Sequence, residues 1–127
     1  GEHDGYSRLE APLIHKREII FVKEKRQLTI VDYFEGNGDH QVDVFWHFSE
    51  ECTVEKNGSK TIVSNQGKRI SILVPDSEIE KSIHFGDETT PLGWVSRQYD
   101  KKNPCNTLKC STQIQGNSSI TTLIEFD

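Results

Sequence analysis

The stretch HKREIIFVKEKRQLTIVDYFEGNGDHQVDVFWHFS, residues 15–49, decides the fold of this chain. Its β-branched and aromatic residues predict three β-strands, at 15–23, 27–35 and 41–48. The charged cluster at 23–26 cannot be buried and marks the first turn. Residues 36–39 mark the second turn, because they include the Gly and Asn that accept the positive φ of hairpin turns. We therefore expect an antiparallel meander of three strands.

The third of these strands carries an apolar stripe, because side chains along a strand alternate between its two faces. Its even-numbered residues from 42 to 48 are all apolar, and positions 28, 30 and 34 form a similar face in the strand before it. A second layer of structure must cover such faces. The predicted core consists of Val42, Val44, Trp46, Phe48, Ile30, Ile72 and Ile124.

The rest of the chain adds short strands separated by turns. Asn57 and Gly58 form the strongest hairpin signal, and strands at 107–115 and 119–126 are predicted to close the chain as a hairpin about Gly116. Residues 100–104 are predicted to form a loop. Short strands at regular spacing predict an all-β fold. We expect a single antiparallel β-sandwich domain over residues 1–127, with roughly nine or ten strands and almost no helix.

Composition excludes several classes of function. Only 33% of the 127 residues are hydrophobic, which suits an antiparallel sheet whose outer faces meet water. The net charge is -5 and no stretch is strongly basic, so we expect no nucleic-acid partner. No apolar run is long enough to predict a membrane span, and no signal peptide is evident. The chain has no Met, which predicts an excised fragment of a longer protein.

Three cysteines leave two interpretations open. Cys105 and Cys110 would face opposite sides of one strand, which opposes a bridge between them. Cys52 could pair with either one, or all three could be buried free thiols. There is no CxxC pair and no close pair of histidines, so the sequence predicts no metal ligand and no cofactor in this chain.

Candidates for chemistry are few, and no catalytic residue is assigned. His3 and Tyr6 are close enough in sequence to assist proton transfer together, but strand alternation predicts that they lie on opposite faces. Trp94 and Tyr99 are aromatic residues near predicted loops. The weak candidates for substrate binding are His3, Tyr6, Trp94, Arg97 and Tyr99.

Several segments of the chain resemble a known family. They are the opening HDGYSRL at 3–9, Pro12, HKR at 15–17, LTIVD at 28–32, the strand around His40, FWHF at 45–48, and GWVS at 93–96 followed by Tyr99. In order and spacing, these segments are similar to the C-terminal region of heparinase II/III-like polysaccharide lyases. The resemblance covers most of the chain.

The resemblance implies an enzyme in two parts. A C-terminal β-sandwich packs against an N-terminal α/α toroid, and the enzyme cleaves a uronic-acid polysaccharide, such as heparin, heparan sulfate or alginate, by β-elimination. It also implies a periplasmic or secreted protein whose catalytic Tyr lies in the toroid and whose metal ligands lie upstream of this chain. We therefore expect the isolated chain to be inactive. An independent carbohydrate-binding or scaffold module, with Trp94, Tyr99 or Trp46 available for stacking on sugars, stays open as an alternative.

Overall fold

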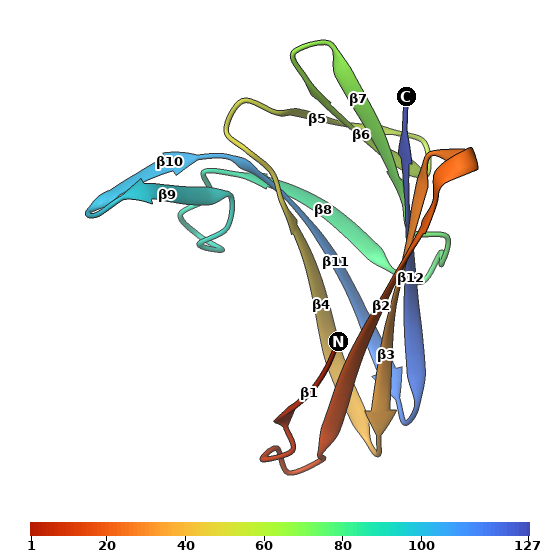
Figure 1. The fold of residues 1–127 in the computed structure, drawn as a ribbon. Helices are drawn as coiled ribbons and strands as arrows, with labels where there is room; N and C mark the ends of the chain where they lie inside the picture. The colour runs from red at the N-terminus through yellow and green to blue at the C-terminus, as the bar shows by residue number, and fades with distance from the viewer.

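Two antiparallel β-sheets form the body of the molecule, and the computed structural model describes all residues, 1–127 (Figure 1). The larger sheet has the strand order β1 (Glu2–Tyr6), β2 (Leu13–Val22), β3 (Gln27–Gly36), β12 (Ser118–Phe126), β7 (Lys68–Leu73), β6 (Lys60–Asn65) and β5 (Thr53–Asn57). The smaller sheet has the order β4 (Asp39–His47), β11 (Asn106–Gln115) and β8 (Glu80–Phe85). The predicted all-β antiparallel sandwich is confirmed.

A separate two-stranded ribbon projects from one side of this body (Figure 1). It consists of β9 (Trp94–Gln98) and β10 (Lys101–Pro104), so the residues predicted as a loop are a strand. Asp100 makes this possible because its φ of 59° allows a tight turn between the two strands. The only helical residues are one short 3-10 turn, Lys23–Lys25, within the predicted charged turn. The total of twelve strands exceeds the predicted nine or ten.

The predicted meander is wrong at its third strand. β2 pairs with β3 as expected, but β4 pairs with β11 in the other sheet, and β3 pairs with β12. The predicted C-terminal hairpin is wrong for the same reason, because β11 and β12 also lie in different sheets. The two turns bind each other, with Gly116 N–H donating to the Gly38 carbonyl at 2.9 Å and Gly36 N–H donating to Asn117 Oδ1 at 3.0 Å. At this pair of turns the chain crosses between the two sheets twice, from β3 to β4 and from β11 to β12.

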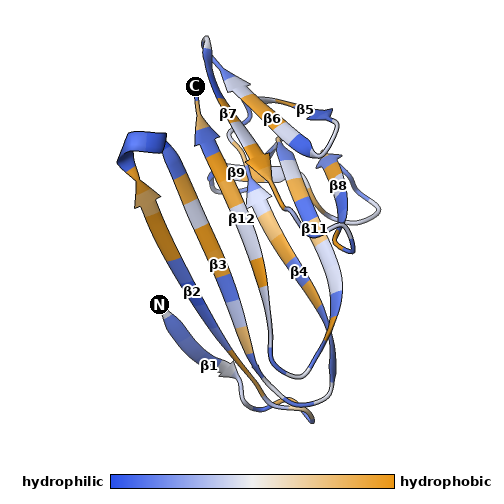
Figure 2. Cartoon of the chain, turned by 90° about the vertical axis from the view of Figure 1, so that its right-hand side faces the viewer, coloured by the Kyte–Doolittle hydropathy of each residue, from blue (hydrophilic) through white to orange (hydrophobic).

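The core lies between the two sheets. Figure 2 shows the alternation of hydrophobic and hydrophilic residues along the strands that buries one face of each sheet. Five predicted core residues are buried, and their burial confirms the stripe: Ile30, Val42, Val44, Ile72 and Ile124. Trp46 and Phe48 are only partly buried and pack against the core from its edge.

Trp46 is partly buried because it lies on β4, which is an edge strand of the smaller sheet. The guanidinium of Arg17 lies over the Trp46 ring, 5.5 Å from its centroid, and the indole Nε1 has no hydrogen-bond partner. The side chain therefore contributes less to stability than a fully enclosed tryptophan would.

All three cysteines are free thiols, as one of the two interpretations predicted, but Cys52 is only partly buried. Cys105 and Cys110 are buried, and burial raises the pKa of the Cys110 thiol to about 11. The structure contains no helix with the length and apolar character that crossing a membrane requires.

Candidate functional site

A β-bulge in the first strand brings His3 and Tyr6 to the same face. His3 lies opposite His15 and Tyr6 lies opposite Leu13, so β1 advances three residues while β2 advances two. The extra residue reverses the alternation of side chains. The His3 and Tyr6 rings are 5.1 Å apart, centroid to centroid. The prediction that these two side chains lie on opposite faces is therefore wrong, because alternation holds only in a strand without a bulge.

The same face carries a chain of hydrogen bonds that ends on a buried carboxylate. His3 Nε2 lies 3.2 Å from His15 Nδ1, and His15 Nε2 lies 2.7 Å from Asp32 Oδ1. Arg17 donates to both oxygens of Asp32, from Nε at 2.6 Å and from Nη2 at 2.8 Å. Asp32 is fully buried, so its charge requires these partners.

The hydrogen-bond pattern assigns the tautomers of both imidazoles. A carboxylate held by Arg17 can only accept, so His15 donates from Nε2, and the neutral form of the ring then accepts at Nδ1. His3 then donates from Nε2 to His15, and its Nδ1 accepts the backbone N–H of Gly5 at 3.2 Å. Every ring nitrogen of the two histidines has a partner within the protein. Neither imidazole offers a free lone pair to a substrate in this state.

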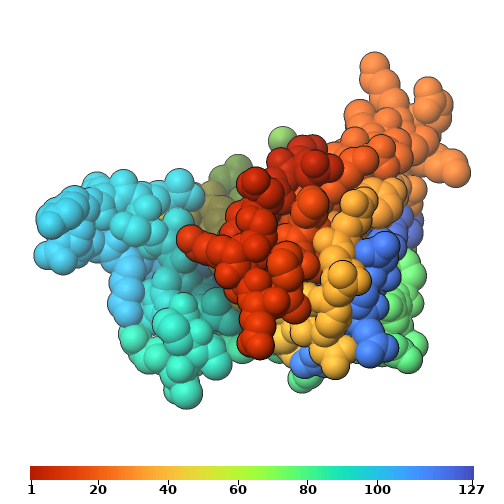
Figure 3. Space-filling view, turned by 90° about the horizontal axis from the view of Figure 1, so that it is seen from below, coloured from red at the N-terminus to blue at the C-terminus, as the bar shows by residue number.

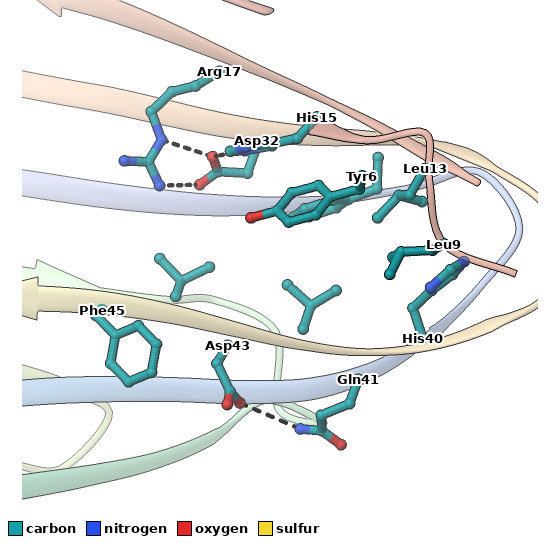
Figure 4. Close-up of a pocket in the computed structure, with 13 residues that line it drawn as sticks. Tyr6, Leu9, Leu13, His15, Arg17, Asp32, His40, Gln41, Asp43 and Phe45 are labelled. Atoms are coloured by element: carbon teal, nitrogen blue, oxygen red, sulfur yellow. Dashed lines mark hydrogen bonds and ion pairs between the residues drawn. The ribbon is translucent and has the colours of Figure 1, made fainter. Parts of the chain in front are cut away.

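A hollow of about 330 Å³ lies beside this network, between the inner face of β2 and β3 and the edge strand β4. We call it the first hollow. Figure 4 shows Tyr6 in the middle of it, with Arg17 and Asp32 on one side and Asp43 and Phe45 on the other. The Tyr6 side chain comes from the exposed strand β1 and is the group of the N-terminal segment best placed to meet a ligand there.

The cationic and anionic groups around the first hollow are paired within the protein. Burial alone would raise the pKa of Asp43, but hydrogen bonds from Ser111 and Lys109 outweigh it and lower the pKa of this carboxyl below its usual value. Lys109 Nζ lies 3.0 Å from Asp43 Oδ2. With Asp32 bound to Arg17 as well, the first hollow offers the phenol hydroxyl of Tyr6 rather than an unpaired carboxylate or guanidinium.

Sequence reasoning missed Asp32, His15 and Arg17. A signal for Asp32 was present, because this acidic residue lies between Ile30 and Phe34 on the apolar face of its strand. A carboxylate at such a position needs partners of opposite charge. His15 and Arg17 lie on the matching face of β2, and Arg17 is directly opposite Asp32 in the register.

The other three candidates lie apart from His3 and Tyr6, on the projecting ribbon. Arg97 makes a two-pronged ion pair with Glu50, at 2.6 and 2.8 Å. The ammonium of Lys102 lies 3.9 Å from the centre of the Trp94 ring, and Tyr99 is fully exposed. Figure 3 shows this ribbon extending well away from the N-terminal segment.

The histidines elsewhere have partners of their own. His84 Nδ1 lies 3.1 Å from Asp87 Oδ2, and His47 Nδ1 lies 3.0 Å from Thr107 Oγ1. His40 contacts the Asn37 carbonyl beside the sheet-crossing turn. No group of three or more His, Cys, Asp or Glu side chains lies together in a way that could hold a metal ion.

Two solved structures share this fold. The heparan sulfate lyase HepC from Pedobacter heparinus superimposes with a TM-score of 0.71 at 16% identity, covering 90% of this chain and 18% of that chain. A heparinase III, the BT4657 gene product with methylated lysines, gives 0.68 at 16% identity, covering 99% of this chain and 18% of that chain. This chain therefore spans under a fifth of the length of either. No curated protein matches it.

Sequence comparison assigns the family more directly than the fold does. Residues 1–123 match the family described as heparinase II/III-like, C-terminal. The match includes strands β1 and β2, which carry His3 and His15, and all but the last residues of β12. The chain belongs to the heparinase II/III-like C-terminal family.

Proposed function

We propose that this chain is the C-terminal β-sandwich of a polysaccharide lyase that cleaves a uronic-acid polysaccharide by β-elimination. The family match over residues 1–123 carries the proposal. The relatives described as a heparan sulfate lyase and a heparinase III support heparin or heparan sulfate as the substrate class, with alginate as the alternative. The parent chain adds an N-terminal α/α toroid and works in the periplasm or outside the cell.

The chemistry of β-elimination requires more than this chain offers. One group must neutralise the uronate carboxylate, a base must remove the adjacent proton, and an acid must protonate the leaving oxygen. These groups must be placed to within about 1 Å. In the first hollow, the nitrogens of His3 and His15 are all bonded and the charge of Arg17 is matched by Asp32. The isolated chain is therefore inactive, and the toroid supplies the missing groups.

The role of this chain is to form one wall of the substrate cleft. The Tyr6 hydroxyl makes no hydrogen bond within the protein and the residue is 45% exposed, so this hydroxyl is free for a sugar. His3 lies against its ring and keeps it in place. Trp94, Arg97 and Tyr99 stay secondary candidates, for a polysaccharide long enough to extend to the ribbon.

An uncovered apolar strip supports packing against a further part of the parent. Ile19 and Phe21 lie on the inner face of β2, opposite Ile30 and Leu28, yet they are 61% and 57% exposed. The smaller sheet does not extend over them. A toroid packed here would bury both side chains and would bring its own residues next to the first hollow.

An ultraviolet assay for the unsaturated uronate product tests the proposal. The toroid-bearing parent should cleave heparan sulfate, heparin or alginate, and the 127-residue chain should cleave none of them. In the parent, Tyr6→Phe should raise KM more than it lowers kcat, because the lost hydroxyl binds substrate. Tyr33→Phe is the matched control, since Tyr33 bonds only Glu18, on the outer side of the larger sheet.

Two outcomes would contradict the proposal. Product formation by the pure chain, abolished by His3→Ala, would make the opening strand catalytic. Glycan binding by the pure chain that is lost in Trp94→Ala, with a parent that cleaves nothing, would favour an independent carbohydrate-binding module.

A further inference from the structure

A second hollow lies on the outer face of the smaller sheet. The strand register aligns Phe45 of β4, Lys109 of β11 and Ser82 of β8 in one row across all three strands. The next row contains Asp43, Ser111 and Glu80. The hollow measures about 280 Å³, and the segment between β8 and β9 closes it on one side with Thr90 and Leu92. We call it the second hollow.

The two hollows adjoin. Phe45 lines both of them, is 38% exposed, and lies at the edge strand that separates them. Figure 3 shows the surface recessed between the N-terminal segment and the segment that follows β8. A polysaccharide chain that places one sugar in the first hollow, beside Tyr6, can therefore place a neighbouring sugar against Phe45.

The second hollow presents mainly hydrogen-bond acceptors. Asp87 can only accept from His84 Nδ1, so in the neutral ring Nε2 accepts the Ser82 hydrogen at 2.9 Å. Thr90 donates to Asp87 at 2.6 Å, and Ser111 donates to the Asp43 carboxylate, also at 2.6 Å. Each of the three hydroxyls uses its hydrogen inside the protein. Ser82 and Ser111 keep their lone pairs free, and Thr90 keeps one, because its Oγ1 also lies 3.3 Å from His84 Nδ1. These lone pairs can accept hydrogens from sugar hydroxyl groups.

The charges around the second hollow disfavour an acidic ligand. Lys109 provides one ammonium group, already paired with Asp43, and Glu80 adds an exposed carboxylate at the rim. Asp87 also stays ionised, because hydrogen bonds from Thr90 and His84 hold its pKa well below the usual range. A sulfate or carboxylate group has only acceptor oxygens, which cannot bond to the free lone pairs of these hydroxyls, and its negative charge would be repelled by the carboxylates nearby. An uncharged sugar has hydroxyl groups that can donate hydrogen bonds to the same lone pairs.

We propose that the second hollow binds an uncharged sugar residue of the polysaccharide, with the sugar ring against Phe45 and its hydroxyls donating to Ser82, Ser111 and Thr90. Lys109 keeps two N–H groups for the sugar oxygens. The inference rests on the proposed function, since it names the neighbour of the acidic sugar in the lyase cleft. It assigns the uncharged units of the polysaccharide to this face.

An NMR titration of the 15N-labelled 127-residue chain tests this assignment without any cleavage. The probes are the methyl glycosides of N-acetylglucosamine and of glucuronic acid. The amide signals of Phe45, Ser82 and Lys109 should shift with the uncharged sugar at millimolar concentration and should respond less to glucuronic acid. Phe45→Leu should weaken binding of the uncharged sugar about tenfold, a loss expected for an aromatic contact.

Matched variants keep the test decisive. Phe45→Leu retains an apolar side chain on an exposed position, so the spectrum should stay dispersed and show that the chain is folded. Phe85→Leu makes the same change at an exposed aromatic residue that lines neither hollow, and it should leave binding unchanged. No shift at tens of millimolar sugar, tighter binding of glucuronic acid, or a site unaffected by Phe45→Leu would each overturn the inference. Lyase activity of the parent is measured separately, so failure of the proposed function stays distinguishable.

Discussion

The middle of the sandwich and its rim follow the same alternation of side chains but reach opposite environments. In the middle, Ile30 on β3 is 4% exposed, because the smaller sheet covers it. Ile19, its direct partner on β2, faces the same way and is 61% exposed. The rim, meaning β1, the part of β2 around Ile19 and Phe21, and the β9–β10 ribbon, lies beyond the cover of the opposite sheet. The alternation of side chains along a strand determines which face of the sheet a residue lies on. Whether that residue is buried depends on whether the opposite sheet extends over it.

The difference also explains where the polar groups gather. The middle holds aliphatic side chains such as Leu108 and Ile72, which need no partner. Toward the rim, inner-face positions carry His15 and Arg17, which lie 22% and 37% exposed at the boundary between core and water. At this boundary between core and water, a long or ring-shaped polar side chain can bond a buried carboxylate at one end while the rest of it stays accessible to solvent. The candidate site therefore lies where the cover ends.

The largest effect should come from the closed middle. Leu108→Ala removes a side chain that is 1% exposed, and the resulting cavity should cost about 3–4 kcal/mol of unfolding free energy. Denaturant melts of the 127-residue chain measure this loss. A cost below about 1 kcal/mol would mean that the sheets can collapse around the gap and that the middle is not closed.

The next largest effect should come from the buried carboxylate at the boundary. Asp32→Ala leaves Arg17 and His15 without their acceptor. Because Arg17 is partly exposed and can be rehydrated, the cost should be about 2–3 kcal/mol rather than the full penalty of a buried unpaired charge. Asp43→Ala is the matched control, since Asp43 is more exposed and should cost under about 1 kcal/mol. Equal losses of unfolding free energy in the two variants would contradict the stronger stabilising role that we assign to Asp32.

A smaller, pH-dependent effect is expected where the ribbon meets the body. The hydrogen bond from Arg97 lowers the pKa of Glu50 from its usual 4.5 to about 2. The folded state therefore holds this carboxyl ionised more strongly than the unfolded state does, so the stabilisation is full above about pH 4.5 and is lost as the pH falls toward 2. Thermal melts of Arg97→Gln and the native chain should differ at neutral pH and converge in acid. A constant difference down to pH 2 would contradict this linkage.

The smallest effect should come from the uncovered strip. Ile19→Thr should change the unfolding free energy by no more than about 0.5 kcal/mol, because the side chain already meets water. Ile30→Thr, at the paired position, should cost more than about 2 kcal/mol, since it buries a hydroxyl in place of an ethyl group. Both are measured by denaturant melts. A large loss for Ile19→Thr in the 127-residue chain would mean that the rim is covered after all.

The sequence by itself determined the class of fold, most strands and the family. β-Branched residues in alternation and turn residues act locally, so strands such as β2, β3 and β12 could be located without tertiary information. The buried residues Ile30, Val44 and Ile124 followed from the same local pattern. Motif order gave the family for the same reason, because it depends on residue identity and spacing alone.

Only the tertiary structure decided which strands pair and where the site lies. The glycine turns before β4 and before β12 suit a hairpin locally, but their bonds to each other carry both strands into the opposite layer. The bulge that joins His3 to Tyr6 and the pairing of Asp32 with Arg17 likewise depend on register between strands. Register and coverage arise from contacts between residues far apart in sequence, and local periodicity carries no information about them.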